Sequence, residues 1–149
     1  MKRLLFLLFP LFTSLQAQTD TAVWYYDFET AMQIAATENK SVLMVFSGSD
    51  WCKPCIKLKK EVLDHPAFCE FAARQLVLLN LDFPRYKKNR LPDAIAFRNE
   101  RLAEKYNPQG IFPMVVLLSP KGEVIDHTGY TTNQPQTFVQ YLSNLISSR

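Results

Sequence analysis

Short apolar runs bounded by polar or turn-forming residues recur along the chain. Three of them, at residues 42–46, 76–81 and 114–118, are rich in Val, Leu, Met and Phe. Runs of this length without alternating polar positions are typical of strands buried on both faces of a sheet. We therefore predict three central strands.

The segments between these runs carry apolar residues at helical spacing. The clearest case is residues 135–146, where Phe138, Leu142 and Leu145 fall on one face of an amphipathic helix. The same spacing and the positions of Pro and Asn predict four further helices, at residues 28–39, 52–63, 66–74 and 93–106.

Two shorter segments complete the pattern. Residues 123–128 follow the run 114–118 after a tight turn, so these two strands must be antiparallel. Residues 23–25 fit either a short edge strand or an apolar plug under the sheet. The order of elements predicts an α/β fold: one domain with a central mixed β-sheet and helices on both faces.

The first residues of the chain have the organisation of a secretory signal peptide. Lys2 and Arg3 precede an apolar run that ends near the small residue Ala17. The run is shorter than the ~20 residues of a membrane-spanning helix, although an uncleaved N-terminal anchor is the alternative. We therefore expect a signal peptide at residues 1–17 and a mature domain at 18–149, periplasmic or secreted and without a membrane span.

Net charge then gives little indication of charged partners. The full chain of 149 residues has 17 Lys and Arg against 14 Asp and Glu, a formal charge of +3. Loss of Lys2 and Arg3 leaves 15 basic residues against 14 acidic ones, or +1. A nucleic-acid partner is not expected at this balance.

Two of the three cysteines lie where a strand is predicted to lead into a helix, in the sequence Trp51-Cys52-Lys53-Pro54-Cys55. The free N–H groups and the dipole of a helix N-terminus stabilise a thiolate on the first cysteine. Cys52, expected to be partly exposed, is then the attacking thiol and Cys55 the resolving one. Trp51 offers a flat apolar surface for docking.

A stapling disulfide or half of a zinc site is the alternative for this pair. Zinc needs two further ligands at matching spacing, and Cys69, His65 and His127 do not supply them as a second pair of Cys or His. No metal is therefore expected. Cys69 is interpreted as a small buried apolar residue, and His65 as a surface or capping residue at a helix start.

At these residues the chain resembles the thioredoxin superfamily, especially its secreted bacterial thioredoxin-like branch. The matching segments are 42–46 with 51–55, then 110–113 before the strand 114–118, and the turn 121–123. The resemblance implies a thioredoxin-like fold in which Pro113 is a cis-proline facing the cysteines. It also implies that Phe112 and Pro113 pair with an extended substrate segment, beside Trp51, Lys53 and Pro54.

The sequence departs from the family on the strand before the cysteines. Many thioredoxins carry a buried acid there, whereas residues 43–46 contain no ionisable group. Proton transfer to the resolving cysteine then depends on water, or on Glu61 if that side chain turns inward. The basic segment 85–90 is either a solvated loop or a docking edge for an acidic partner.

The expected function is thiol–disulfide exchange on extracytoplasmic proteins, with reduction as the favoured direction and no cofactor. The partners would be disulfide-containing protein substrates and a membrane-linked electron donor, since an oxidising compartment does not itself supply electrons. The alternative is a non-catalytic binding module of the same fold that docks peptides or holds a metal through its thiols.

Overall fold

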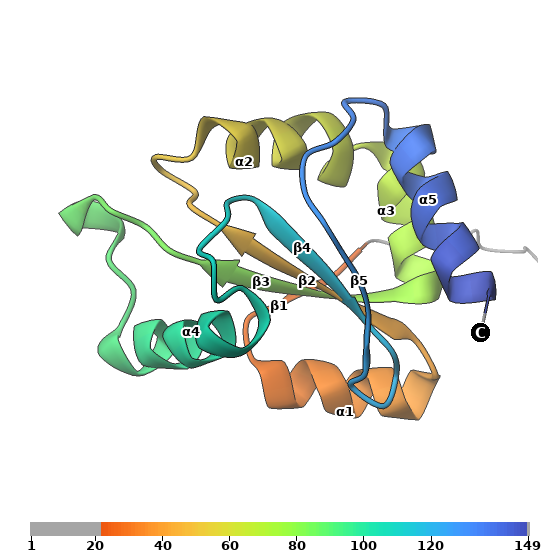
Figure 1. Cartoon of the computed structure of the whole chain (residues 1–149), viewed down its shortest axis with the longest axis horizontal. Coiled ribbons are helices and arrows are strands. Elements are labelled where there is room, and N and C mark those ends of the chain that lie inside the picture. The colour runs from red at the N-terminus through yellow and green to blue at the C-terminus, as the bar shows by residue number, and fades with distance from the viewer. Residues whose placement is uncertain (1–21, 149) are drawn as a thin grey trace, which may run out of the picture.

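Strand β2 (Ser41–Ser47) lies at the centre of a five-stranded sheet, because its apolar run offers no polar side to water. The protein is described here by a computed structural model, in which residues 22–148 are placed. The strand order is β1-β3-β2-β4-β5. The other strands are β1 (Trp24–Tyr25), β3 (Leu76–Asp82), β4 (Met114–Leu118) and β5 (Val124–Thr128) (Figure 1).

The sheet is mixed, as predicted. Strands β1 and β2 both run parallel to β3, whereas β4 is antiparallel to β2 and β5 is antiparallel to β4. The tight turn at residues 119–122 therefore joins antiparallel strands, which confirms that prediction. Residues 24 and 25 pair with β3, so the edge-strand interpretation of this segment is the correct one.

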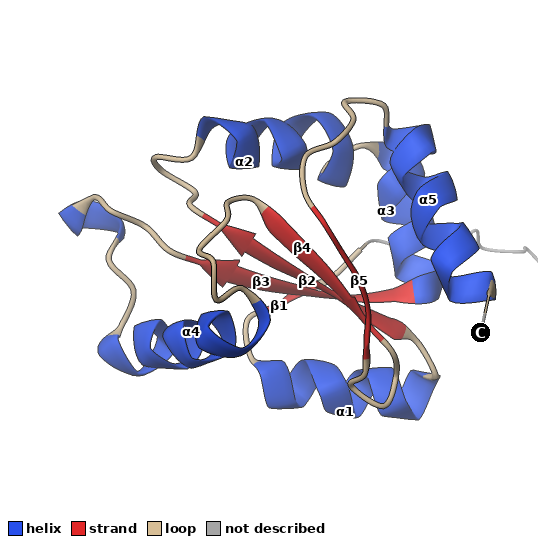
Figure 2. Ribbon diagram, in the orientation of Figure 1, coloured by secondary structure: helices blue, strands red, loops and turns tan. Residues whose placement is uncertain are grey.

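Helices cover both faces of the sheet (Figure 2). Two lie against one face, α1 (Phe28–Glu38) and α4 (Asp93–Tyr106). The other face is covered by α2 (Lys53–Leu58) with its π-helical continuation η1 (Lys59–Leu63), by α3 (Pro66–Gln75) and by α5 (Pro135–Ser147).

Alternate residues of β2 enter two separate apolar cores. Leu43 and Val45 pack with α2, η1, α3 and α5, whereas Val42, Met44 and Phe46 pack with α1 and with Tyr106 of α4. All five side chains are at most 3% exposed. The predicted central mixed sheet with helices on both faces is confirmed.

Two local features differ from the predicted pattern. The helix expected at residues 52–63 changes to π-helix at Lys59, where the Asp64 N–H donates to the carbonyl of Lys59 at 2.8 Å. The basic loop after β3 contains a short 3₁₀ turn, η2 (Lys87–Asn89). Helical spacing of apolar residues does not distinguish such tighter and wider turns.

None of the helices in residues 22–148 is long and apolar enough to cross a membrane. The signal peptide expected at residues 1–17 lies outside the described residues.

Phe138 tests the core on the α5 side of the sheet. It is 1% exposed, and its ring centroid lies 6.1 Å from that of Phe68 on α3. Phe138→Ala should lower the free energy of unfolding in urea by about 3–5 kcal/mol, because a cavity remains. Gln136→Ala, at an exposed position of the same helix, should change it by less than about 0.5 kcal/mol. Equal losses in the two variants would contradict this packing.

Candidate functional site

Three loops meet at one end of the sheet (Figure 1). Strands β2 and β3 are parallel, so the segments that follow them, 48–52 and 83–92, emerge at the same end. Strand β4 is antiparallel to β2 and starts there, which brings in the segment 107–113. The topology therefore gathers Trp51, both cysteines of the motif and Pro113 from distant parts of the sequence.

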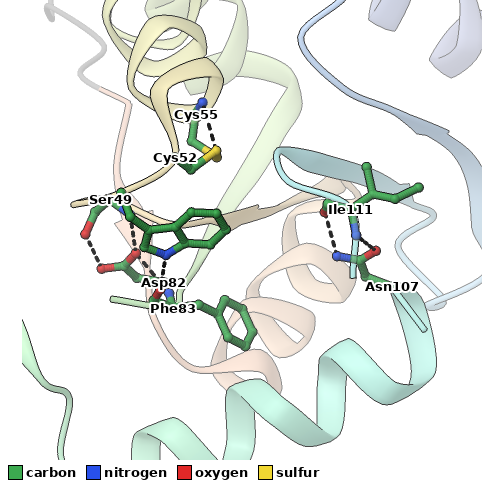
Figure 3. The surroundings of a disulfide bond; sticks show 8 residues. Ser49, Cys52, Cys55, Asp82, Phe83, Asn107 and Ile111 are labelled. Atoms are coloured by element: carbon green, nitrogen blue, oxygen red, sulfur yellow. Dashed lines mark hydrogen bonds between the residues drawn. A yellow bond between two sulfur atoms is a disulfide. The ribbon is translucent and has the colours of Figure 1, made fainter. Parts of the chain in front are cut away.

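Cys52 and Cys55 form a disulfide at the start of α2 (Figure 3). Their Cα atoms are 5.2 Å apart. Cys52 is the N-cap of α2, and its Sγ accepts a hydrogen bond of 3.2 Å from the Cys55 N–H. The same N–H would stabilise negative charge on Cys52 after reduction, since an unpaired helix N–H attracts an anion.

Both sulfur-bearing residues are buried in this disulfide form. Cys52 is 4% exposed and Cys55 is 3% exposed, so the expectation that Cys52 is partly exposed is wrong for this state. The cause is geometric: Cys52 Sγ is turned back into the first turn of α2, toward Cys55, and not outward. Lys53 and Pro54, which follow it on α2, are exposed.

The indole of Trp51 is fixed between the loops. Its Nε1–H donates to the carbonyl of Phe83 at 2.7 Å, and its ring meets Phe112 edge-on at 5.4 Å between centroids. The Arg85 guanidinium lies 3.6 Å from the ring centroid, in a cation–π contact. Gly48 packs so close to the ring that no Cβ fits there. The Trp51 ring is therefore held in one position, and the Arg85 guanidinium covers part of its face.

The Phe112–Pro113 peptide bond is cis, as the resemblance implied. The loop that carries it is held by Asn107, whose buried side chain both donates to the Ile111 carbonyl (2.8 Å) and accepts from the Ile111 N–H (3.0 Å). Figure 3 shows this pair of hydrogen bonds across from the disulfide. Gly129, after β5, comes so near the Pro113 carbonyl that an added Cβ would lie 3.0 Å from it.

Two aspartates that sequence reasoning missed tie the loops together. Asp82, at the end of β3, accepts from the N–H (2.9 Å) and the hydroxyl (2.6 Å) of Ser49 (Figure 3). Asp50 accepts from the N–H groups of Arg85 and Tyr86, each at 2.9 Å, and from the Asn89 amide at 3.0 Å. The only signal in the sequence is that each aspartate follows a predicted strand, Asp82 directly after residues 76–81 and Asp50 in the turn after residues 42–46.

Hydrogen bonding controls the charge state of Asp50. Desolvation raises the pKa of this carboxyl, but the hydrogen bonds from the Arg85 N–H, the Asn89 amide and the Tyr86 N–H outweigh that effect. The net pKa therefore lies below the ordinary value of 3.8. Asp50 stays ionised at neutral pH and holds the basic loop beside Trp51.

A cavity of about 370 Å³ borders Cys55 and Pro113 on the α2 side of the sheet. Val45 and its register partner Asn80 line it. The lining residues, all within the described range, include one carboxylate, Asp64, and the Lys59 ammonium engages it at 2.6 Å. Val45 of β2 thus contributes an aliphatic side chain to this cavity. Many thioredoxins instead carry a buried acid on this strand.

Glu61 does not line this cavity. Its carboxylate accepts a hydrogen bond from the Tyr130 hydroxyl. That hydrogen bond, with desolvation and the nearby negative charge, raises the pKa of Tyr130. The possibility that Glu61 turns inward toward Cys55 is therefore not realised.

The other candidate ligands lie apart from the disulfide. His65 is the N-cap of α3, and its Nδ1 accepts from the Ala67 N–H at 3.2 Å, which confirms the capping interpretation. Cys69 is half-buried, less than expected, and its thiol donates to the Leu63 carbonyl at 3.5 Å. Desolvation raises the pKa of this thiol. Across residues 22–148, no group of three or more His, Cys, Asp or Glu could hold a metal ion.

Gly48 tests the fixed position of Trp51. A Cβ there would lie 2.3 Å from Cε2 of the ring, so Gly48→Ala must displace the indole and break its bond to Phe83. We expect a shift in Trp51 emission, measured in a Trp24→Phe background, and a loss of about 1–3 kcal/mol in unfolding free energy. In a Trp51→Ala background, Gly48→Ala should leave the unfolding free energy almost unchanged. An undiminished loss of unfolding free energy in that background would rule out the ring contact.

Asp50 gives a pH-dependent test of the loop tether. Because its folded-state pKa is depressed, its contribution to stability is present above pH 3.8 and is lost as pH falls through the lower folded value. Asp50→Asn should therefore lower the melting temperature at pH 7, and the difference from wild type should shrink as the pH falls below 3.8. Glu100→Gln, an equal charge change at an exposed helix position, should show no such pattern. A pH-independent difference for Asp50→Asn would contradict the tether.

Comparison with known proteins identifies the family. Residues 28–146 match the model of the thioredoxin-like domain. The chain is 27% identical over 122 residues to disulfide bond reductase DsbH of Chlamydia pneumoniae, covering 82% of this chain and 72% of that protein. It is 30% identical over 117 residues to thioredoxin-related protein DsbJ of the same organism, covering 78% of this chain but 32% of DsbJ.

A solved structure supports the same assignment. The DsbH oxidoreductase structure superimposes with a TM-score of 0.78 at 26% identity, and the match covers 87% of each chain. The family match extends over strands β2 to β5, the Cys52–Cys55 pair and the cis-proline loop. The chain belongs to the thioredoxin-like domain family, as the resemblance predicted.

Proposed function

We propose that this thioredoxin-like oxidoreductase reduces disulfides in extracytoplasmic proteins through Cys52 and Cys55. The observation that carries the proposal is the Cys52–Cys55 disulfide at the start of α2, in one loop cluster with the cis Phe112–Pro113 bond. Similarity to DsbH, which is named a disulfide bond reductase, supports reduction as the direction. The oxidised pair is then the product state of the enzyme.

The reaction consists of two exchanges that start from the reduced pair. The Cys52 thiolate attacks one sulfur of the substrate disulfide, forms a mixed disulfide with it and expels the second substrate sulfur as a thiolate. Cys55, once deprotonated, attacks Cys52 Sγ, restores the disulfide seen here and expels the first substrate sulfur. Two electrons pass to the substrate, and an external dithiol donor returns them.

The groove for the substrate lies between the motif loop and the cis-proline loop. Phe112 and Pro113 present backbone to an extended segment beside Cys52, in the manner of strand addition. The Trp51 ring, held by its hydrogen bond to the Phe83 carbonyl, forms one wall of this groove. Lys53 and Pro54 are exposed on the first turn of α2. These five residues bind substrate in the proposal, whereas the two cysteines carry the chemistry.

Proton exchange at Cys55 takes place through the cavity beside it. The volume of about 370 Å³ has room for several water molecules, and Asn80 and Ser47 line it together with Cys55. Water in this space removes the thiol proton before the resolving step. No side-chain acid at the position of Val45 is then required, although resolution would be slower than with a fixed base.

The cellular setting in the proposal follows from the N-terminal sequence. Residues 1–17 would direct export and be cleaved near Ala17, which leaves residues 18–149 in the periplasm or outside the cell. A reductase there needs a membrane-linked electron donor, because the compartment is oxidising. Mass determination of the exported protein tests the cleavage position.

Trapping with a resolving-cysteine variant tests the function. Cys55→Ala retains the attacking thiol but lacks the group that releases the substrate, so mixed disulfides through Cys52 should accumulate on non-reducing gels. Cys52→Ala should trap nothing and should lose at least ~10³-fold in rate on a model disulfide. Cys69→Ala should trap nothing extra and should turn over like wild type. If Cys55→Ala traps nothing and wild type reduces no model disulfide with a dithiol present, the proposal fails.

A further inference from the structure

Positive charge accumulates on the loop beside the disulfide. Four of the six residues from 85 to 90 are basic, namely Arg85, Lys87, Lys88 and Arg90. All four are exposed. Arg90 is paired with Asp93 at 3.0 Å, whereas the ion pairs of residues 22–148 include none of the other three. Three cations thus remain available to a partner.

The loop is held against the motif that contains Cys52. Asp50 accepts three hydrogen bonds from residues 85, 86 and 89, and Trp51 donates to the carbonyl of Phe83. Arg85 in turn lies over the Trp51 ring. Because Asp50 and Trp51 immediately precede Cys52, these contacts place the cationic loop at a set position relative to the attacking sulfur.

The nearby carboxylates form no ion pair with Arg85, Lys87 or Lys88 among the described residues. Asp50 and Asp82 are directed at N–H and hydroxyl donors of the loops. A hollow of about 430 Å³ separates the loop from α4, and Asp93 and Glu100 line it from the helix. Asp93 is already paired with Arg90, which leaves Asp82 and Glu100 as the two carboxylates lining this hollow without an ion pair in the described part of the chain.

The exposed apolar groups nearby suit a polypeptide partner. Tyr86 is 56% exposed and Ile111, next to the cis-proline loop, is 46% exposed. The ring of Trp51, which precedes Cys52, is in edge contact with that of Phe112, which precedes Pro113. A polypeptide segment bound along Phe112 and Pro113 would thus meet apolar groups near its own cysteine. It would meet positive charge on the side that faces the loop after β3.

We propose that Arg85, Lys87 and Lys88 select substrates whose cysteine is flanked by acidic residues. The inference rests on the proposed function and names the substrate class of the same site. Asp or Glu side chains two or more residues from the substrate cysteine would approach the loop while the cysteine meets Cys52. Charge complementarity of this kind raises association rates and is weakened by salt.

The effect should be moderate, because each exposed charge pair is weak and screened. We expect the pre-reduced protein to react about five- to tenfold faster with an acidic disulfide peptide than with a neutral one at 20 mM salt. A basic peptide should react more slowly than the neutral one. At 0.5 M NaCl the ratio of acidic to neutral rates should approach one.

The experiment uses three disulfide peptides of one length that differ only in flanking Glu, Gln or Lys. Single-turnover rates with the pre-reduced protein are divided by the rates with uncharged dithiothreitol, which corrects for the reactivity of each peptide. The loop variant is Arg85→Gln with Lys87→Gln and Lys88→Gln. The matched control is Arg74→Gln with Lys105→Gln and Lys121→Gln, three exposed positions outside the loop with the same total charge change.

The loop variant should lose most of the acidic preference, and the control variant should retain it. The double variant Lys87→Gln with Lys88→Gln leaves Arg85 on Trp51 and should lose part of the preference. Equal wild-type rates on all three peptides, or equal losses in loop and control variants, would overturn the inference while leaving the reductase proposal intact. Failure to reduce any of the peptides would instead reject the reductase proposal itself.

Discussion

Burial of β2 on both faces is the constraint on which the rest of the structure depends. Side chains from Val42 to Phe46 alternate between two cores, so the strand can lie only at the centre of the sheet with helices above and below. Its carboxyl end therefore emerges in the middle of one edge of the sheet. The cysteine motif follows directly, and the parallel β3 and antiparallel β4 bring their loops to the same edge.

Polar side chains then set the distances between these loops. Asn107 pairs with both backbone groups of Ile111, Asp82 holds Ser49, and Asp50 holds the loop after β3. Ring contacts of Phe112 with Trp51 and Phe83 also join the loops, and hydrogen bonds to ionised or buried groups add directional restraints. Each of these side chains bonds to backbone N–H or C=O groups of a loop, and Asp82 and Asp50 also accept from a loop side chain.

The main elements of the fold were predictable because their signals are local. Apolar runs and helical spacing predicted every long strand and helix, and the cysteine motif with its later proline predicted the family. The burial of Cys52 was not predictable, since it depends on how one sulfur turns within the helix start. Asp50 and Asn107 were missed for a related reason: a single polar residue in a loop reveals its partner only when the tertiary structure is known.

In the proposed function, the dithiol donor meets both sulfurs in this buried disulfide form. With Cys52 and Cys55 at 4% and 3% exposure, little sulfur surface is available to attract a partner. In the proposals above, substrate recognition depends on the walls around this site: the cis-proline backbone, the Trp51 ring and the cationic loop. Those walls need fixed positions, because a weak surface contact contributes to binding only if it is not offset by the entropy of ordering a mobile loop. The hydrogen bonds of Asp50 and Asn107 supply that order before the substrate arrives.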